Sequence, residues 1–313
     1  PQTRLGLAQW LIDPAHPLTA RVTMNRMWQH HFGLGLVKTS ENFGMQGEQP
    51  SHPALLDWLA TEFIRRKWDV KAMHKLIVTS ATYRQNSVVT PELLKRDPEN
   101  RLLARGSRKR LNPYAIRDAA LFTSGLLNGQ IGGPSVKPYM PPGIWKSISN
   151  AAYKQDKGAR LYRRSMYTYW RRTIPPPTMM TFNAAEREVC IVRKGLTTTP
   201  LQALVLMNNK TFVEAARFLA ERTLRQRITE PHKRLEWAFR TVLSRNPTQD
   251  ELEVLVADLN LYLKDFKKRP DAAKKLLTVG EKKADAKLPA IELAAYALVA
   301  NTIFNLDEAI TQN

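Results

Sequence analysis

Seven prolines interrupt the middle of this chain, all of them between residues 131 and 199. Proline lacks a backbone N–H and clashes with the preceding helical turn, so a continuous helix cannot cross this region. On either side of it, apolar residues recur at the spacing of an amphipathic helix. The sequence therefore predicts a mostly α protein, a multi-helical globular array with a Pro-rich irregular or short-stranded insertion at about 131–199.

The helical signals are local and specific. Leu55, Leu59 and Phe63 repeat at helical spacing after Ser51, which is a typical N-cap residue. Thr248 and Glu251 have the spacing of a capping box. The Lys-, Asp- and Ala-rich stretch at 271–287 is expected to be a solvated excursion. Helices are expected at residues 18–32, 53–67, 70–79, 114–127, 200–208, 211–225, 233–243, 248–266 and 289–304.

The length of 313 residues suits one large domain or two smaller ones. We expect an N-terminal helical region at 1–130, a basic insertion rich in proline and aromatic residues at 131–199 and a C-terminal helical region at 200–313, packed as one compact unit. The longest apolar run, 288–304, is broken by Pro289 and Glu292, so no transmembrane segment is expected. The single cysteine, Cys190, excludes an internal disulfide, and its apolar neighbours predict a buried thiol.

Positive charge is concentrated in the middle third of the chain. Residues 101–200 carry 18 Lys/Arg against 4 Asp/Glu, whereas residues 1–100 carry 12 against 9 and residues 201–313 carry 18 against 15. A surplus confined to one region is typical of a surface that faces a polyanion, an acidic partner or a membrane surface.

Within that third, one run of ten residues interleaves arginines with aromatic rings. Arginine forks bind phosphate, sulfate or carboxylate groups, and aromatic faces stack on bases or sugar rings. If the run were a strand, its residues would alternate between two faces. The alternative interpretation is a core strand whose arginines pair with acids from the helical ends. The predicted binding residues are Arg163, Arg164, Tyr167, Tyr169, Trp170, Arg171 and Arg172.

Catalytic and metal signals are weaker. His52 at a helix start with Asp57 one turn on, and the pair Glu186 and Arg187, are the candidates for acid–base chemistry. Helix capping is the alternative role for the first pair. Adjacent side chains on a helix diverge by about 100°, so His30 and His31 are expected not to chelate one ion together. We expect no metal site and no cofactor.

Three blocks of sequence carry a family resemblance. They read NRMWQHHFGLGLV at 25–37, ENFGMQGEQPSHPALLDWLATEF at 41–63 followed by WDVKAMHKLIVTSATYRQ at 68–85, and TFNAAEREVCIVRKGLTTTPLQALVLMNN at 181–209. In this order they resemble a bacterial domain of unknown function that is typical of planctomycetes. That domain lies at the C-terminal end of large exported proteins, often downstream of a planctomycete-type cytochrome c domain. Two carboxylates of the family pattern are replaced here by Asn42 and Asn183.

The resemblance implies an extracytoplasmic, periplasmic or cell-surface location and no known activity. Combined with the charge, it favours a non-catalytic binding or scaffolding module of an exported multidomain protein. Its partner would be an acidic polysaccharide or an acidic protein domain, including the cytochrome c domain of the same full-length protein. Two alternatives stay open: a nucleic-acid-binding protein, and a hydrolase acting on an extracellular polymer.

Overall fold

The computed structural model describes residues 3–146, 152–192, 195 and 197–312. The described chain is mostly helical, as the sequence predicts, and its strands form a two-stranded antiparallel ribbon. The residues divide into two compact units. The N-terminal unit comprises residues 1–110, 191–193 and 311–313, and the C-terminal unit comprises residues 111–190 and 194–310.

The N-terminal unit is built around helices α2, α3 and α4, which enclose a core that includes Met24, Phe63 and Ile77. Helix α2 ends at Gly33, whose φ of 85° continues the chain without the steric cost of a side chain. Helix α3 ends two residues before the predicted position, because Lys67 and Trp68 take left-handed backbone conformations. The elements are α1 (Arg4–Leu11), α2 (Thr19–Phe32), α3 (Pro53–Arg65), α4 (Val70–Val78), α5 (Pro91–Arg96), β1 (Lys109–Arg110) and β2 (Thr311–Gln312).

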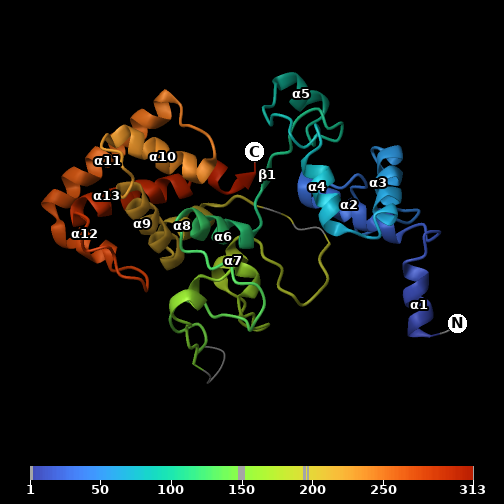
Figure 1. Cartoon of the computed structure of the whole chain (residues 1–313), viewed down its shortest axis with the longest axis horizontal. Coiled ribbons are helices and arrows are strands. Elements are labelled where there is room, and N and C mark those ends of the chain that lie inside the picture. Colours follow the sequence, from blue (N-terminus) through green and yellow to red (C-terminus); the bar gives the residue numbers. More distant parts are fainter. Residues whose placement is uncertain (1–2, 147–151, 193–194, 196, 313) are drawn as a thin grey trace. The chain divides into compact units, whose positions relative to one another are not determined.

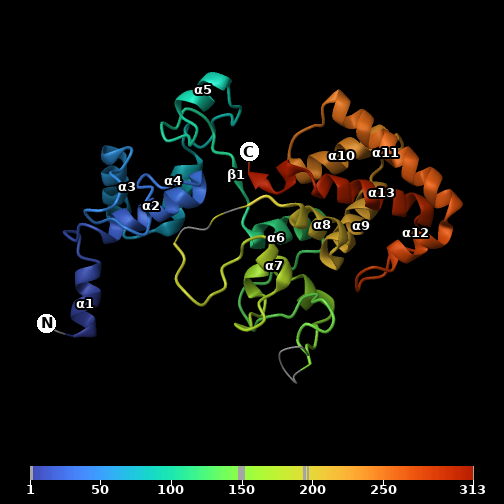
Figure 2. The same cartoon turned by 180° about the vertical axis from the view of Figure 1, so that it is seen from behind.

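The C-terminal unit is organised around α13, which packs against α9, α10, α11 and α12 (Figures 1 and 2). Alanines at 294, 295 and 297 of α13 are buried and let the neighbouring helices approach closely. The elements are α6 (Pro113–Thr123), η1 (Gly158–Tyr162), η2 (Ser165–Tyr167), α7 (Pro177–Thr181), α8 (Pro200–Asn208), α9 (Lys210–Leu224), α10 (Pro231–Leu243), α11 (Gln249–Lys268), α12 (Pro270–Leu277), α13 (Ala290–Phe304) and η3 (Asp307–Ala309).

The stretch at 271–287 is not the solvated excursion that its composition predicts. Helix α12 occupies its first part, and Ala273 is fully buried in the core. The following loop is held by the buried carboxylate of Glu214, which accepts hydrogen bonds from the backbone N–H groups of Glu281 and Lys282 at 2.9 and 3.0 Å. This stretch therefore packs onto the core with little apolar surface, because the buried Glu214 carboxylate accepts hydrogen bonds from its backbone N–H groups.

The described part of the insertion at 131–199 is irregular, as its prolines predict. It contains the 3₁₀ helices η1 and η2, the short helix α7 and single β-bridges such as the one between Val136 and Thr168. A hydrogen bond from the Asn128 N–H to the Tyr162 carbonyl ties the insertion to the segment that follows α6. Apart from residues 191–193, which are assigned to the N-terminal unit, the insertion thus belongs to the C-terminal unit with its helical scaffold.

Candidate functional site

The run from Arg163 to Arg172 does not form a strand. Arg163 and Ser165 are buried while Arg164 is exposed, but the alternation then slips, because Thr168 is buried and Tyr169 is exposed. The cause is η2, in which the N–H groups of Tyr167 and Thr168 bond locally to the carbonyls of Arg164 and Ser165. The face assignment that a strand would give therefore does not hold beyond residue 166.

Arg163 is used inside the fold. Its guanidinium donates to the carbonyl oxygens of Pro134 at 2.9 Å and Gln130 at 3.1 Å, and also to that of Gly132. It stacks on the ring of Tyr167, whose hydroxyl accepts from the Gly132 N–H at 2.7 Å. Only 3% of Arg163 is exposed, so this arginine and Tyr167 fix the glycine-rich turn at 129–133.

Two other arginines of the run are paired with local acids. Arg164 lies 4.0 Å from Asp118, and Arg172 lies 3.2 Å from Glu188. Nearby, Arg160 is paired with Asp156. These three ion pairs use three of the four acids in residues 101–200, namely Asp118, Asp156 and Glu188. Arg164 is therefore paired with an acid of helix α6, as the alternative interpretation expects, whereas Arg172 is paired with an acid of the insertion itself.

A different group of residues gathers cations and rings at one place, and we call Lys137, Trp145, Tyr169 and Arg171 the cation–aromatic cluster. The Lys137 ammonium lies 5.0 Å from the centre of the Tyr169 ring and 6.0 Å from that of Trp145. The Arg171 guanidinium lies 4.9 Å from the centre of the Trp145 ring. Such cation–π contacts are worth about 0.5–2 kcal/mol each and hold the cations in place.

The charges of this cluster are unpaired among the residues that the structure describes. Neither Lys137 nor Arg171 makes an ion pair there, and both are half-buried. The indole N–H of Trp145, a residue 7% exposed, has no hydrogen-bond partner in the same part of the chain. Lys146 and Lys154 add exposed positive charge in the adjoining sequence.

Tyr153 packs against the cation–aromatic cluster. Its ring lies 5.2 Å from that of Trp145, and its hydroxyl donates to the Pro138 carbonyl at 2.6 Å. Burial raises the pKa of Tyr153, and the nearby Asp156 carboxylate raises it further. The phenol therefore stays protonated and acts as a fixed hydrogen-bond donor.

Trp170, Glu186 and Arg187 form a separate contact. The Trp170 indole donates to the Glu186 carbonyl at 3.1 Å, and the Arg187 guanidinium stacks on the same indole at 4.4 Å. These residues, predicted as binding or catalytic groups, join the loop at 186–188 to the run at 163–172.

The single cysteine, Cys190, is exposed. The prediction of a buried thiol is thus wrong, because Val189 and Ile191 are exposed as well.

His52 and Asp57 do not form a dyad. His52 is itself the N-cap residue of α3, in the place where Ser51 was expected to act, and its Nδ1 lies 3.0 Å from the Ser51 hydroxyl. Asp57 is ion-paired with Arg21 at 2.6 Å. Both belong to the N-terminal unit, while Glu186 and Arg187 belong to the C-terminal unit.

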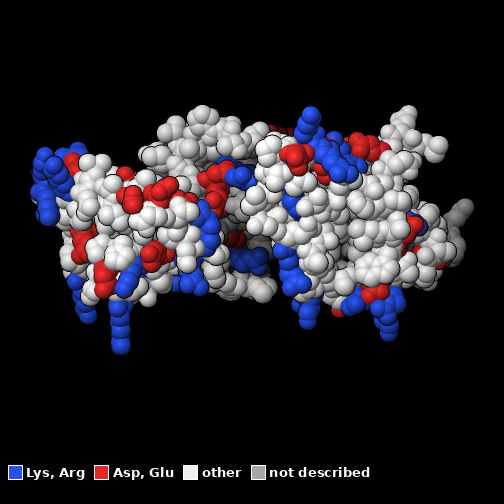
Figure 3. Space-filling view, turned by 90° about the horizontal axis from the view of Figure 1, so that it is seen from above, with Lys and Arg blue, Asp and Glu red and all other residues white. Residues whose placement is uncertain are grey.

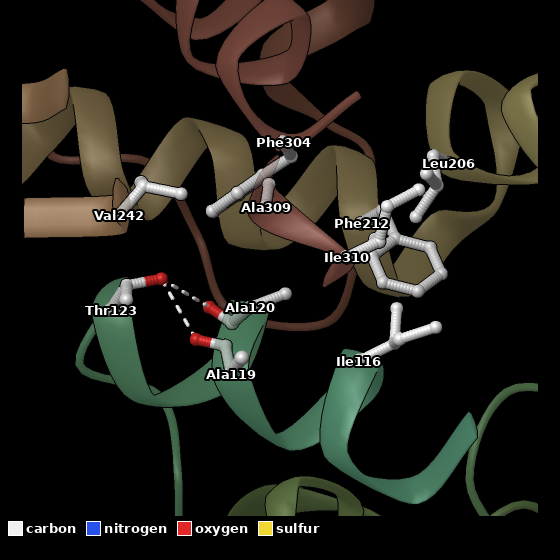
Figure 4. Close-up of a pocket in the computed structure, with 10 residues that line it drawn as sticks. All are labelled: Ile116, Ala119, Ala120, Thr123, Leu206, Phe212, Val242, Phe304, Ala309 and Ile310. Carbon is white, nitrogen blue, oxygen red and sulfur yellow. Dashed lines mark hydrogen bonds between the residues drawn. The ribbon is translucent and has the colours of Figure 1, made fainter. Parts of the chain in front are cut away.

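In two cavities of the described C-terminal unit, the polar groups already have partners. One is lined by apolar side chains and by Thr123, whose hydroxyl donates to the Ala119 and Ala120 carbonyls (Figure 4). Another includes Arg117 and Tyr139, but Arg117 donates to the Arg163 and Leu161 carbonyls and Tyr139 donates to Glu214.

Among the described residues, no group of three or more His, Cys, Asp or Glu side chains is placed to hold a metal ion. No helix among those residues combines the length and the apolar character that crossing a membrane requires.

Comparison of the chain with known proteins finds a match to the model of one protein family. The family model described as PSD1, protein of unknown function (DUF1553), matches residues 3–259. The match includes the N-terminal helices, the cation–aromatic cluster and the C-terminal helices as far as the middle of α11. The resemblance to an uncharacterised domain, expected from the sequence blocks, is confirmed at this level. Neither the curated proteins nor the solved structures include a significant match.

Proposed function

The chain belongs to the PSD1 family of proteins of unknown function (DUF1553), which assigns it no activity. We therefore propose a function from the candidate site. The chain is a non-catalytic binding module of an exported, multidomain bacterial protein. It binds the carboxylate or sulfate groups of an acidic polysaccharide through the cation–aromatic cluster. The extracytoplasmic location follows from the planctomycete-type resemblance and belongs to the same proposal.

The observation that carries the proposal is the pair of unneutralised cations held on aromatic rings. Arg171 offers a planar fork that suits a carboxylate or sulfate group, and Lys137 adds a point charge beside it. Tyr169 is 37% exposed, which leaves part of its ring open to a sugar face. Because the rings already fix both cations, less side-chain entropy is lost when an anion binds.

The test is retention of the full chain on immobilised dextran sulfate and on immobilised alginate at low salt. The variant Lys137→Gln/Arg171→Gln should bind about tenfold more weakly, because two charge-assisted contacts are lost. The control Lys267→Gln/Lys268→Gln makes the same change of net charge at exposed positions of α11 and should bind as the unaltered chain does. Circular dichroism checks that each variant is folded. Equal retention of both double variants would overturn the proposal.

A second variant separates a glycan from an acidic protein partner, such as the cytochrome c domain of the same full-length protein. Tyr169→Leu keeps the charge of the cluster but removes the exposed ring. Glycan binding should weaken more than binding to an acidic domain, since sugar stacking needs the ring, whereas an acidic domain loses only the support that the ring gives to Lys137.

Nucleic acid is the remaining alternative, and the electrostatic argument for it is similar. The middle third supplies enough positive charge for salt-dependent binding to DNA. A gel shift with an oligonucleotide, competed by dextran sulfate, decides between the two. An oligonucleotide that binds more tightly than either polysaccharide, at equal salt, would favour the nucleic-acid alternative.

A further inference from the structure

Helix α11 has an exposed face that runs along its whole length of 20 residues, and the helix lies at the outer edge of the C-terminal unit (Figures 1 and 2). Its inner face packs into the core through Leu255 and Leu259. On the opposite face, Val254 and Leu261 are each 60% exposed, and the exposed Ala257 lies between them. The spacing of three and four residues puts these three side chains on one line, which we call the α11 seam.

Charge is divided along the same face. Acids are exposed near the start of the helix and lysines near its end, namely Asp250 and Glu253, then Lys264, Lys267 and Lys268. None of these five side chains makes an ion pair in the part of the chain that the structure describes. This order suits the dipole of α11 itself, and it also makes the face complementary to a copy of itself that runs in the opposite direction.

We propose that this face of α11 is the interface of a symmetric dimer, in which it packs antiparallel against α11 of a second copy of the chain. A twofold axis near the middle of the helix brings the acidic end of each α11 against the basic end of the other. Ala257 then lies opposite Leu261 of the partner subunit. Val254 packs against the methylene groups of Lys264 of the partner subunit, whose ammonium group reaches solvent.

The antiparallel arrangement also pairs the charges beside the seam. Side chains on the same flank of two antiparallel helices face each other, so Glu253 lies opposite Lys267 of the partner subunit. Asp250 lies opposite Lys268 of the partner subunit, and the twofold axis repeats both pairs. The other flank, which carries Asp258, is half-buried in its own unit. A parallel arrangement would place acids against acids and lysines against lysines, so charge selects the antiparallel one.

The size of the seam sets the strength of the dimer. Three apolar side chains from each copy bury far less surface than a standard protein–protein interface, so the dimer forms only at high protein concentration. Its ion pairs are exposed, and added salt therefore weakens it. The tests of polysaccharide binding use protein below this range, so their control at Lys267 and Lys268 depends on charge alone.

The test is analytical ultracentrifugation of the full chain from about 1 µM to about 1 mM at low ionic strength. We expect a reversible equilibrium between monomer and dimer that shifts towards monomer as salt is added. Glu253→Lys and Lys267→Glu each turn two attractive pairs into repulsive ones and should raise the dissociation constant about tenfold or more. The control Glu92→Lys makes the same change of charge as Glu253→Lys at an exposed position of α5 and should leave the equilibrium unchanged.

A mixture of the two interface variants tests the antiparallel register. In a mixed dimer, the Glu253→Lys chain and the Lys267→Glu chain again place opposite charges against each other at both pairs. Equal amounts of the two variants should therefore form a dimer about as tight as that of the unaltered chain, although each variant alone dimerises weakly. Both positions are exposed, and circular dichroism checks that each variant is folded.

Three results would overturn the interface. One is an unaltered chain that stays monomeric up to the highest concentration. Another is a dimer of unchanged strength in Glu253→Lys and in Lys267→Glu, which would place the contact elsewhere on the molecule. The third is a mixture of these two variants that dimerises no better than either variant alone.

Discussion

At the scale of single residues, Arg163 shows how a residue type that suggests binding can instead hold the fold. Replacing it by methionine would leave the carbonyl oxygens of Pro134, Gln130 and Gly132 without their donor. We expect Arg163→Met to lower the free energy of unfolding by about 1–3 kcal/mol, measured by urea denaturation. Arg164→Met, which removes a long and partly exposed ion pair to Asp118, should change it by less than about 0.5 kcal/mol. Similar values for the two variants would contradict the structural role of Arg163.

Gly280 makes a second residue-level prediction, because its backbone and its surroundings both exclude a side chain. Its φ is +100°, and a Cβ atom there would lie 2.3 Å from the carboxylate carbon of Glu214. Gly280→Ala should therefore strain the backbone and displace Glu214 from the loop amides, at a cost of about 2 kcal/mol. Gly129→Ala is the matched control, since nothing lies within 4 Å of its Cβ position. A thermal midpoint of Gly280→Ala equal to that of the control would refute this account of the loop.

At the scale of elements, the regular helices could be predicted and the docking of irregular segments could not. The capping box of α11 is confirmed, since the Thr248 hydroxyl accepts from the Glu251 N–H and the Glu251 carboxylate accepts from the Thr248 N–H. This motif is local, so four residues of sequence contain it. Glu214, by contrast, holds the loop after α12 from more than 60 residues away. A contact between residues so far apart in the sequence leaves no local pattern. The burial of Arg163 among the carbonyls at 130–134 could not be predicted for the same reason, since these groups lie about 30 residues from it.

The start of α11 also predicts a pH dependence of stability. Glu251 accepts two hydrogen bonds from Arg245, at 2.8 and 2.6 Å, and these bonds lower the pKa of Glu251 from its usual 4.5 to about 2. Because the folded pKa is the lower one, the stabilisation is complete above about pH 4.5 and is lost as the pH falls towards 2. The thermal midpoint should therefore fall over this range, and Glu251→Gln should flatten that part of the curve. An unchanged slope in Glu251→Gln would assign the acid sensitivity to other carboxylates.

At the scale of the whole molecule, the charge asymmetry of the sequence has a partial explanation in the structure. On the surface around α10–α13, acidic and basic side chains lie next to each other (Figure 3), and Arg234–Glu292 and Arg245–Glu308 are ion pairs there. The basic third lacks that balance at Lys137 and Arg171. The surplus predicted the region of the candidate site, and the predicted run at 163–172 contains two residues of the cation–aromatic cluster, Tyr169 and Arg171. Lys137 and Trp145 were missed, although they lie in the same Pro-rich insertion and share its combination of cations and rings.

The assignment of the last residues to the N-terminal unit gives a prediction about the whole chain. Strand β2 pairs with β1, with Lys109 opposite Gln312, and the Gln312 side chain donates to the Tyr83 hydroxyl at 2.8 Å. Removal of residues 311–313 should therefore speed amide hydrogen exchange at Lys109, which lies opposite Gln312, and leave exchange in α13 unchanged, although α13 is nearer in sequence. The expected loss of stability in the N-terminal unit is about 1–2 kcal/mol. Gln312→Ala, which keeps the backbone pairing and removes only the bond to Tyr83, should produce a smaller effect in the same place. Faster exchange in α13 with protection kept at β1 would show that these residues stabilise the C-terminal unit instead.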